Sequence, residues 1–128
     1  NSVRQGTRDA VRRAVVGDVG NDLTCPIVGG LGLTGDTHAL VCLTKEMVGL
    51  DQGATRVSVG FDASYAEGDV LILCTQYPLE SISGFYGFLL NGNMLRAQGH
   101  MRVERTNVNG VDIGLSSFQE IGDWSWCG

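Results

Sequence analysis

The fold of this chain is decided by residues 70–77, VLILCTQY, a nearly continuous run of β-favouring residues. Apolar and polar residues alternate in two further stretches, 57–63 and 95–104. Alternation with a period of two is typical of strands that bury one face. Residues 66–69, AEGD, connect the first two stretches tightly. The pattern therefore predicts a small antiparallel sheet of three to four strands within residues 55–105.

The second and third predicted strands are joined by a longer crossing, residues 78–93. This crossing contains the aromatic residues Phe85, Tyr86 and Phe88. Such a cluster is more often part of a core, or a lid over a sheet, than a ligand site. The third strand has a polar face that is expected to lie in water or in a protein interface. The residues of that face are Arg96, His100, Arg102 and Glu104.

A helix is predicted over residues 2–16, because arginines recur every four residues on one side. This charged stripe consists of Arg4, Arg8 and Arg12. The opposite face is narrow and carries Val3, Thr7, Ala10, Val11 and Ala14. A face of small side chains gains little from burial, so we expect this helix to continue a longer one that enters from upstream. The stripe is a solvated face or, alternatively, a contact with lipid phosphates or an acidic partner surface.

A second helix is predicted over residues 36–48, with Asp36 as its N-terminal cap and Gly49 at its end. Its apolar stripe consists of Leu40, Leu43, Met47 and Leu50. Residues 30–35, GLGLTG, precede it and match a dinucleotide-binding pattern. That pattern requires a buried strand in front and a βαβ unit around it, and the chain has room for neither. We therefore interpret the match as accidental.

Length and composition describe one folded domain over residues 1–128, with 43% apolar and 18% charged residues. The net charge of −5 argues against a protein that binds nucleic acid directly. The expected class is α+β, with two helices packed on the small sheet. Residues 1–16 are the end of the N-terminal helix, 17–54 a loop and a helix, 55–105 the antiparallel sheet, and 106–128 a docked tail.

Four widely spaced cysteines, without a C-x-x-C pair, indicate two disulfides. They are Cys25, Cys42, Cys74 and Cys127. Four cysteines allow three pairings, and the sequence alone does not choose among them. We favour Cys25 with Cys42, which closes a glycine-rich loop, and Cys74 with Cys127, which ties the tail to a central strand. Four buried free thiols in a cytosolic protein are the weaker alternative.

The tail contains both tryptophans of the chain, Trp124 and Trp126, next to Cys127. Large aromatic side chains are costly to leave in water, and a disulfide provides a covalent tether. We therefore expect the tail to be docked on the body of the domain.

No catalytic constellation stands out in the sequence. The two histidines, His38 and His100, lie in different predicted elements, and there is no G-x-S-x-G motif. His38 and Cys42 are four residues apart and could share a helix face, but paired cysteines at ligand spacing are missing. We expect no enzymatic activity, no cofactor and no metal site.

Several segments carry a family resemblance. Residues 3–12, VRQGTRDAVR, look like an Arg/Gly/Ala-rich stretch that directly follows a transmembrane segment, and residues 68–79, GDVLILCTQYPL, like a penultimate strand that ends in Tyr-Pro. Residues 85–90, FYGFLL, are similar to the apolar segment after it, and residues 101–104, MRVE, to the closing strand. In this order they resemble the TadE-like family of the tight-adherence (Flp) pilus system.

Two cysteine-containing segments point to one branch of this family. Residues 123–127, DWSWC, and residues 42–45, CLTK, look like the cysteine-containing, actinobacterial-type branch of that family. Together the similar segments extend over nearly the whole chain, and their shared order is more specific than any of them alone.

The resemblance implies the plan of a type IV pilin: a cytoplasmic N-terminus, a prepilin-peptidase site, a hydrophobic membrane or filament helix, and an external globular domain. We expect the processing site and the hydrophobic helix upstream of this sequence. The implied function is that of a minor pilin or pseudopilin in pilus assembly and, through it, in adhesion, aggregation or DNA uptake. Its partners would be other pilins and assembly proteins, and its place the cell envelope or the pilus.

The residues expected at an assembly interface are Arg4, Arg8, Arg12, Arg96, Arg102 and Glu104. A second hypothesis is a secreted or envelope-anchored module for ligand binding or adhesion, which would use Phe85, Tyr86 and the loop around them. An enzyme is the least favoured class.

Overall fold

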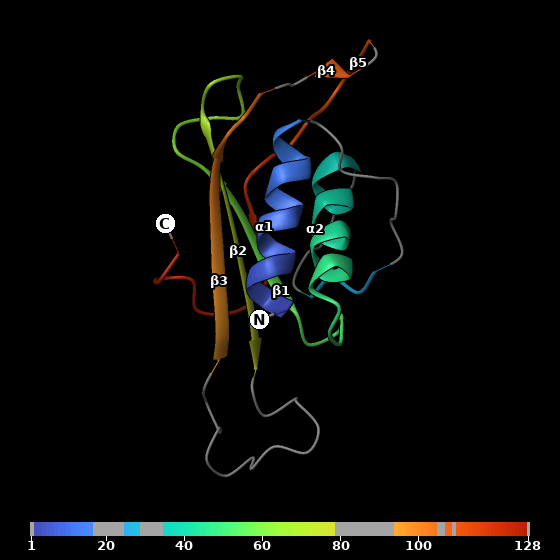
Figure 1. The fold of residues 1–128 in the computed structure, drawn as a ribbon, viewed down its shortest axis with the longest axis vertical. Coiled ribbons are helices and arrows are strands. Elements are labelled where there is room, and N and C mark those ends of the chain that lie inside the picture. Colours follow the sequence, from blue (N-terminus) through green and yellow to red (C-terminus); the bar gives the residue numbers. More distant parts are fainter. Residues whose placement is uncertain are drawn as a thin grey trace.

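The computed structural model describes residues 2–16, 25–28, 35–78, 94–104, 107–108 and 110–127. In these residues two helices, α1 (Ser2–Val15) and α2 (Gly35–Val48), cover one face of an antiparallel sheet (Figure 1). The predicted α+β class is therefore confirmed. None of the helices in the described ranges has the length and the apolarity that a membrane crossing requires.

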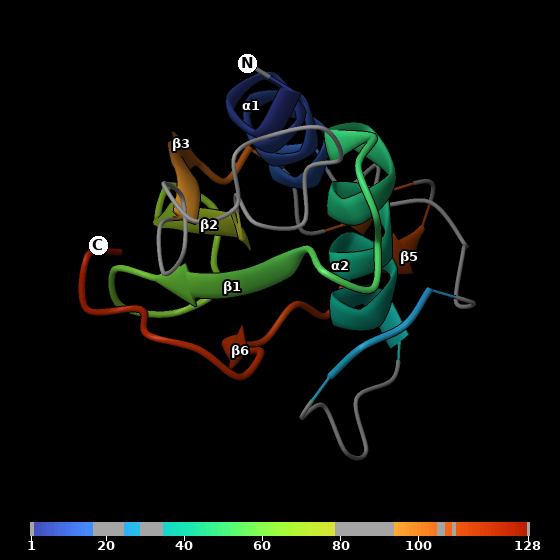
Figure 2. The same cartoon turned by 90° about the horizontal axis from the view of Figure 1, so that it is seen from below.

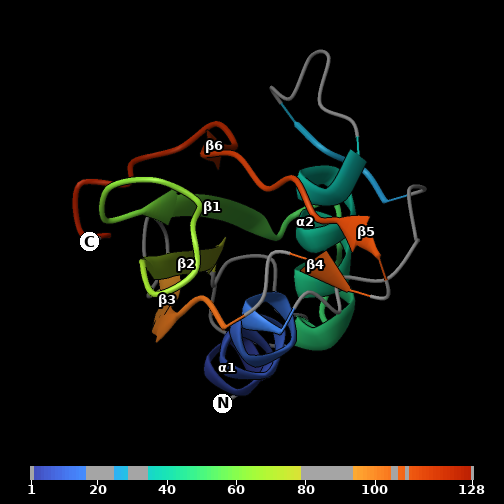
Figure 3. The same cartoon turned by 90° about the horizontal axis from the view of Figure 1, so that it is seen from above.

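The main sheet has four strands in the order β3-β2-β1-β6, and each neighbouring pair is antiparallel. The strands are β1 (Arg56–Phe61), β2 (Val70–Pro78), β3 (Met94–Arg102) and β6 (Phe118–Gln119). A separate ribbon of β4 (Asn107–Val108) and β5 (Val111–Asp112) lies beyond one end of the sheet (Figure 1), on the side of α2 (Figure 3). These short strands and β6 all fall within residues 106–128, which were predicted only as a tail.

The apolar run that predicts β2 reflects burial on both faces of the sheet. Leu73 points to the helices and Cys74 to the opposite face, and both are 0% exposed. The tail covers this opposite face, where Cys127 is bonded to Cys74. The sequence of a strand that is covered on both sides is a continuous apolar run rather than an alternation of apolar and polar residues.

The first strand ends at Phe61, two residues before the predicted end at Ala63. The backbone N–H groups of Ala63 and Ser64 donate to the carboxylate of Asp69 instead of continuing the ladder. The carboxylate of Asp69 also accepts from the backbone N–H of Val70. These hydrogen bonds lower the pKa of Asp69, and those from Ser64 and Val70 have the largest effect. The predicted turn at residues 66–69 is present, with Asp69 N donating to Ala66 O at 3.1 Å, inside a longer connection.

The two faces of α1 are those that the sequence pattern predicts. Its arginine stripe is exposed. The buried face consists of Val3, Gly6, Thr7, Ala10, Val11, Ala14 and Val15. On that face the Thr7 hydroxyl bonds the carbonyl of Val3 at 2.6 Å and the hydroxyl of Thr75 in β2 at 2.9 Å. The polar atom of this small face is thus satisfied across the helix–sheet contact.

Small residues let α1 approach its neighbours closely. A Cβ added at Gly6 would lie 2.6 Å from backbone atoms of Val48 in α2, and one added at Gly99 would lie 2.9 Å from Cγ1 of Val11. Close approach multiplies dispersion contacts, which compensates for the little apolar area that each small side chain buries. The narrow face is therefore sufficient to pack α1 on both α2 and β3.

The burial of α2 extends well beyond its predicted apolar stripe. Leu40 and Leu43 are buried, but Met47 and Leu50 are only half-buried. Further buried positions are Thr37, Ala39, Val41, Cys42, Thr44, Lys45 and Val48. The helix is enclosed because α1, β1 and the segment 25–28 lie around it (Figure 2). A single apolar stripe is typical of a helix on the surface, whereas α2 has neighbours on several sides.

The ends of α2 differ in how well they were predicted. The helix begins at Gly35, so Asp36 lies in its first turn, where its Oδ2 accepts from the backbone N–H of Gly114 at 2.8 Å. Asp36 therefore joins the helix to the chain before β6 instead of serving as the predicted cap. Gly49 ends the helix as predicted, with a φ of 74° that favours glycine.

The tail docks on the body of the domain, as predicted, and it lies on the face of the sheet away from the helices (Figure 1). Trp124 is 7% exposed, and its indole N–H donates to the carbonyl of Glu120 at 2.7 Å. Trp126 is half-buried, with the guanidinium of Arg96 5.5 Å from its ring centroid. The tail is thus held by a covalent bond, a buried ring and a cation–π contact.

Replacing Gly6 with alanine tests the close packing of α1. Alanine favours a helix by about 1 kcal/mol over glycine, but its methyl group would overlap backbone atoms of Val48, which cannot turn away. Overpacking of this kind costs about 1–3 kcal/mol. Because the overlapped atoms belong to the backbone, we place this site at the upper end of that range and expect a net loss of stability of about 2 kcal/mol in urea denaturation.

Gly60→Ala in β1 is the matched control, because no atom lies within 4 Å of its added Cβ. We expect its effect to stay within about 0.5 kcal/mol. If Gly6→Ala is as stable as this control, α1 does not pack as closely as described.

Candidate functional site

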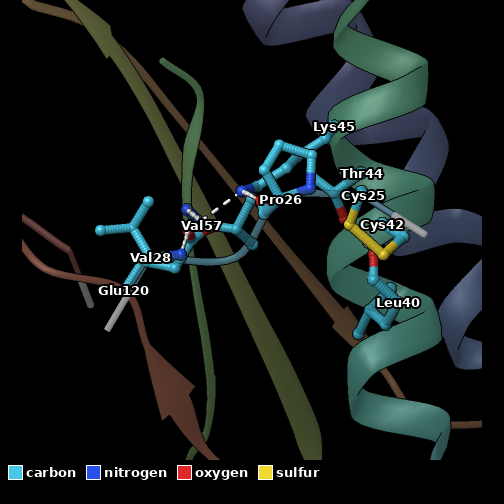
Figure 4. The surroundings of a disulfide bond; sticks show 9 residues. All are labelled: Cys25, Pro26, Val28, Leu40, Cys42, Thr44, Lys45, Val57 and Glu120. Atoms are coloured by element: carbon cyan, nitrogen blue, oxygen red, sulfur yellow. Dashed lines mark hydrogen bonds and ion pairs between the residues drawn. A yellow bond between two sulfur atoms is a disulfide. The ribbon is translucent and has the colours of Figure 1, made fainter. Parts of the chain in front are cut away.

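A fully buried ion pair lies at the centre of the described segments (Figure 4). Nζ of Lys45 in α2 is 3.0 Å from Oε2 of Glu120, and both side chains are 0% exposed. Nζ also donates to the carbonyl of Pro26. The carboxylate of Glu120 accepts from the backbone N–H of Val28 at 3.0 Å and of Val57 at 3.1 Å. Four separate segments therefore meet at two charges.

The surroundings of the pair explain its electrostatics. Burial lowers the pKa of Lys45, because the ammonium loses its hydration; the hydrogen bond with Glu120 and its negative charge act in the opposite direction. Neither side chain is exposed to solvent, so a substrate has no access to them. The arrangement fits a structural role, in which a compensated charge pair fixes the positions of α2, β1, the segment 25–28 and the chain after β6.

The two disulfides join the pairs that the sequence analysis favoured. Cys25 is bonded to Cys42 with their Cα atoms 5.4 Å apart, and Cys74 to Cys127 at 6.2 Å. The first bond attaches the segment 25–28 to α2, beside the ion pair (Figure 4). The second attaches the tail to β2.

The fold brings a third potential ligand to the first disulfide. The ligand atoms of Cys25, His38 and Cys42 all lie within 4.8 Å of one another. The sequence spacing indicated that His38 and Cys42 share a helix face, and the favoured disulfide placed Cys25 beside Cys42. The sequence analysis did not combine these two expectations into one cluster of three ligands.

The residues expected at an assembly interface lie on two adjoining elements and are all exposed. Arg4, Arg8 and Arg12 follow one side of α1, whereas Arg96 and Arg102 lie on β3, an edge strand of the sheet. Glu104 follows β3, and its backbone N–H donates to the carbonyl of Val15 near the end of α1 at 2.7 Å.

The sheet separates these charges into two surfaces. Alternate residues of β3 face opposite sides, so Arg96 and Arg102 point to the tail side while Gly99 faces α1. Both arginines also have contacts within the domain: Arg96 lies over the ring of Trp126, and Arg102 donates to the carbonyl of Gly68 at 2.8 Å. The residues expected at one interface therefore lie on two sides of the sheet.

Two hollows flank this edge of the domain. One, of about 270 Å³, lies between α1 and β3 and is lined by residues that include Arg8, Arg12 and His100. A larger one, of about 670 Å³, lies where the tail crosses the sheet and is lined by charges of both signs, among them Arg56 and Asp123. The hydrogen bonds that Asp123 accepts from Ser125 lower its pKa, so this carboxylate is already engaged within the tail. Neither hollow presents a catalytic arrangement.

Sequence reasoning missed Lys45 and Glu120. A lysine among the apolar residues of α2 is the one indication the sequence offers, since a charge on a central helix requires a buried partner. The aromatic residues Phe85, Tyr86 and Phe88 of the second hypothesis lie outside the described residues, as do residues 30–34 of the glycine-rich pattern.

Replacing Lys45 with methionine tests the ion pair. The variant leaves the Glu120 carboxylate buried without its counter-charge, which we expect to cost about 3–5 kcal/mol in chemical denaturation. Asp9→Asn is the matched control, because it breaks an exposed pair with Arg12 at 3.8 Å, and exposed pairs contribute within about 1 kcal/mol.

A second variant separates lost packing from the unpaired charge. Adding Glu120→Gln to Lys45→Met neutralises the remaining carboxylate, so we expect the double variant to be more stable than the Lys45→Met protein. A double variant whose loss equals the sum of the two single losses would contradict the coupling.

Comparison of the chain with known protein-family models, curated proteins and solved structures found no match. The resemblance to the TadE-like family thus remains a prediction that rests on the order of its motifs.

Proposed function

We propose that this chain is the extracytoplasmic domain of a TadE-like minor pilin or pseudopilin, which acts in the assembly of a tight-adherence pilus. Adhesion, aggregation or DNA uptake would follow from assembly. The observation that carries the proposal is the arrangement of α1, which lies on the sheet by a face of small residues and exposes a row of arginines. In the proposal, α1 is the end of the membrane or filament helix.

The placement of α1 supports this role. Its N-terminal end lies at the end of the domain where β2 finishes and β3 begins (Figure 1). A helix that continues upstream from there would leave the domain without crossing the sheet. The first turn of α1 has no acidic residue, whereas the last turn contains Arg12 and Arg13, which favour the negative end of the helix dipole. The charges of Arg12 and Arg13 therefore stabilise the C-terminal end of α1. In the proposal, the N-terminal end is stabilised because the helix continues upstream.

The disulfides support a position outside the cytoplasm. Cys25–Cys42 and Cys74–Cys127 account for all four cysteines, and such bonds persist in oxidising compartments. Cys25–Cys42 fastens the segment 25–28 to α2, and Cys74–Cys127 fastens the tail to β2. A subunit exposed on the cell surface would benefit from covalent anchoring of this kind.

The arginine stripe supports a role in contacts with other molecules. Arg8 and Arg12 are exposed, and the ion pair of Arg12 with Asp9 is loose at 3.8 Å. Their guanidinium groups are therefore available to acidic surfaces of neighbouring subunits or to lipid phosphates.

Reversing the charge at Arg8 and Arg12 tests the interface in the full-length protein. We expect the double variant Arg8→Glu/Arg12→Glu to lose most piliation in a deletion strain, counted by electron microscopy, while the isolated domain stays folded. Because Arg12 lies at the negative end of the helix dipole and pairs with Asp9, the isolated domain should lose only about 1 kcal/mol of stability. Arg8→Lys/Arg12→Lys keeps the charge and is the control, with near-normal piliation expected. Normal piliation in the reversed variant would exclude α1 as the contact.

The location of the full-length protein tests the proposal as a whole. A C-terminally tagged product is followed by mass spectrometry after the cells are sheared. Recovery with sheared pili indicates a filament subunit, and retention in the membrane indicates an assembly or priming component. Free protein in the medium would overturn the proposal and favour the secreted ligand-binding or adhesion module.

A further inference from the structure

A histidine lies beside the Cys25–Cys42 disulfide and adds a third potential metal ligand. His38 lies one turn before Cys42 on α2, and Cys25 is brought to the same place by the segment 25–28. The three ligand atoms lie within 4.8 Å of one another. Cys42 is buried, whereas Cys25 and His38 are half-exposed, so the cluster opens to solvent on one side.

This donor set suits a thiophilic divalent ion once the disulfide is reduced. Two thiolates and one imidazole are typical zinc ligands, with a fourth position left for water. In a tetrahedral site the two sulfurs lie about 3.8 Å apart, as follows from Zn–S bonds of about 2.3 Å. The Cα atoms of the two cysteines, 5.4 Å apart, are close enough for both sulfurs to reach one ion. Two thiolates also neutralise the charge of the ion.

We propose that Cys25, His38 and Cys42 form a zinc-type metal site that exists only while the Cys25–Cys42 bond is reduced. A dithiol reductant gives two electrons and two protons to the disulfide and becomes a disulfide itself, which leaves two cysteine thiols. The ion then displaces both thiol protons and binds the two thiolates and the imidazole. The proposal is independent of the role in pilus assembly.

The ion pair keeps the site assembled without the disulfide. Pro26 directly follows Cys25, and its carbonyl accepts from Nζ of Lys45, one turn after Cys42 on α2. Val28 donates to the carboxylate of Glu120 at 3.0 Å. The segment that carries Cys25 is therefore held by two hydrogen bonds besides its disulfide, one with Lys45 of α2 and one with Glu120 after β6. Reduction frees the sulfurs while these bonds hold the two thiols close together.

Titration with Co²⁺, a spectroscopic substitute for Zn²⁺, tests the proposal. The protein is reduced with dithiothreitol, separated from it by anaerobic gel filtration and compared with the oxidised protein. We expect one Co²⁺ per reduced chain, with the visible bands of tetrahedral Co²⁺ and thiolate charge-transfer absorption. Zn²⁺ should displace Co²⁺ and so abolish both the visible bands and the charge-transfer absorption. The oxidised protein should show neither, and equal binding by both forms would overturn the proposal.

Three variants assign the ligands. Cys25→Ser/Cys42→Ser retains Cys74 and Cys127 and should lose the charge-transfer band, which excludes the second cysteine pair as the site. His38→Ala should weaken binding by more than about tenfold and change the visible bands. His100→Ala removes a histidine on β3 and should bind as the wild type does. Unchanged binding in His38→Ala would overturn the assignment.

Circular dichroism covers the case in which the reduced chain unfolds. A site that belongs to the folded state stabilises that state, and the stabilisation rises with the logarithm of the free metal concentration once this exceeds the dissociation constant. Zn²⁺ should then restore the helical signal of the reduced wild type but not that of Cys25→Ser/Cys42→Ser. A reduced chain that stays unfolded with excess Zn²⁺ would overturn the proposal.

Discussion

The buried ion pair of Lys45 and Glu120 is the interaction on which the arrangement of the described segments depends. Burying two charges costs several kcal/mol per ion unless every donor and acceptor finds a partner. Here those partners are backbone groups of Pro26, Val28 and Val57, so the charges are compensated only when α2, β1, the segment 25–28 and the chain after β6 are all in place. The pair therefore specifies their positions together rather than one at a time.

The long elements of this fold are predictable because their patterns repeat several times within one element. The period of four along α1 and the period of two along β3 separate buried from exposed faces, and the apolar run of β2 indicates cover on both sides. The alternation along β1 predicts the strand but not its burial, because Ser58 is buried as well as Val57 and Val59. Two-residue strands such as β6 contain no repeat, so nothing in the sequence distinguishes them from a tail. The broad burial of α2 was missed because neighbours, not periodicity, determine how many sides of a helix are covered.

The candidate site is only partly predictable, because its members come from distant parts of the chain. The number and spacing of the cysteines indicate two disulfides, and the favoured pairing agrees with the structure. Lys45 and Glu120 are separated by 75 residues, and a sequence contains no information on which charges will meet. The arginines of β3 were grouped with those of α1 because both sets lie on predicted polar faces, whereas the alternation of the strand turns Arg96 to the other side of the sheet.

The placement of the two disulfides determines how the domain would carry mechanical tension. A pull on the C-terminal end passes from Cys127 directly to Cys74 in β2, so β3 and the rest of the intervening chain bear no load. The Cys25–Cys42 bond removes residues 26–41 from the stretched path in the same way. Only residues 1–25 and 42–74 could lengthen, and the tension would enter the sheet at a central strand held by neighbours on both sides.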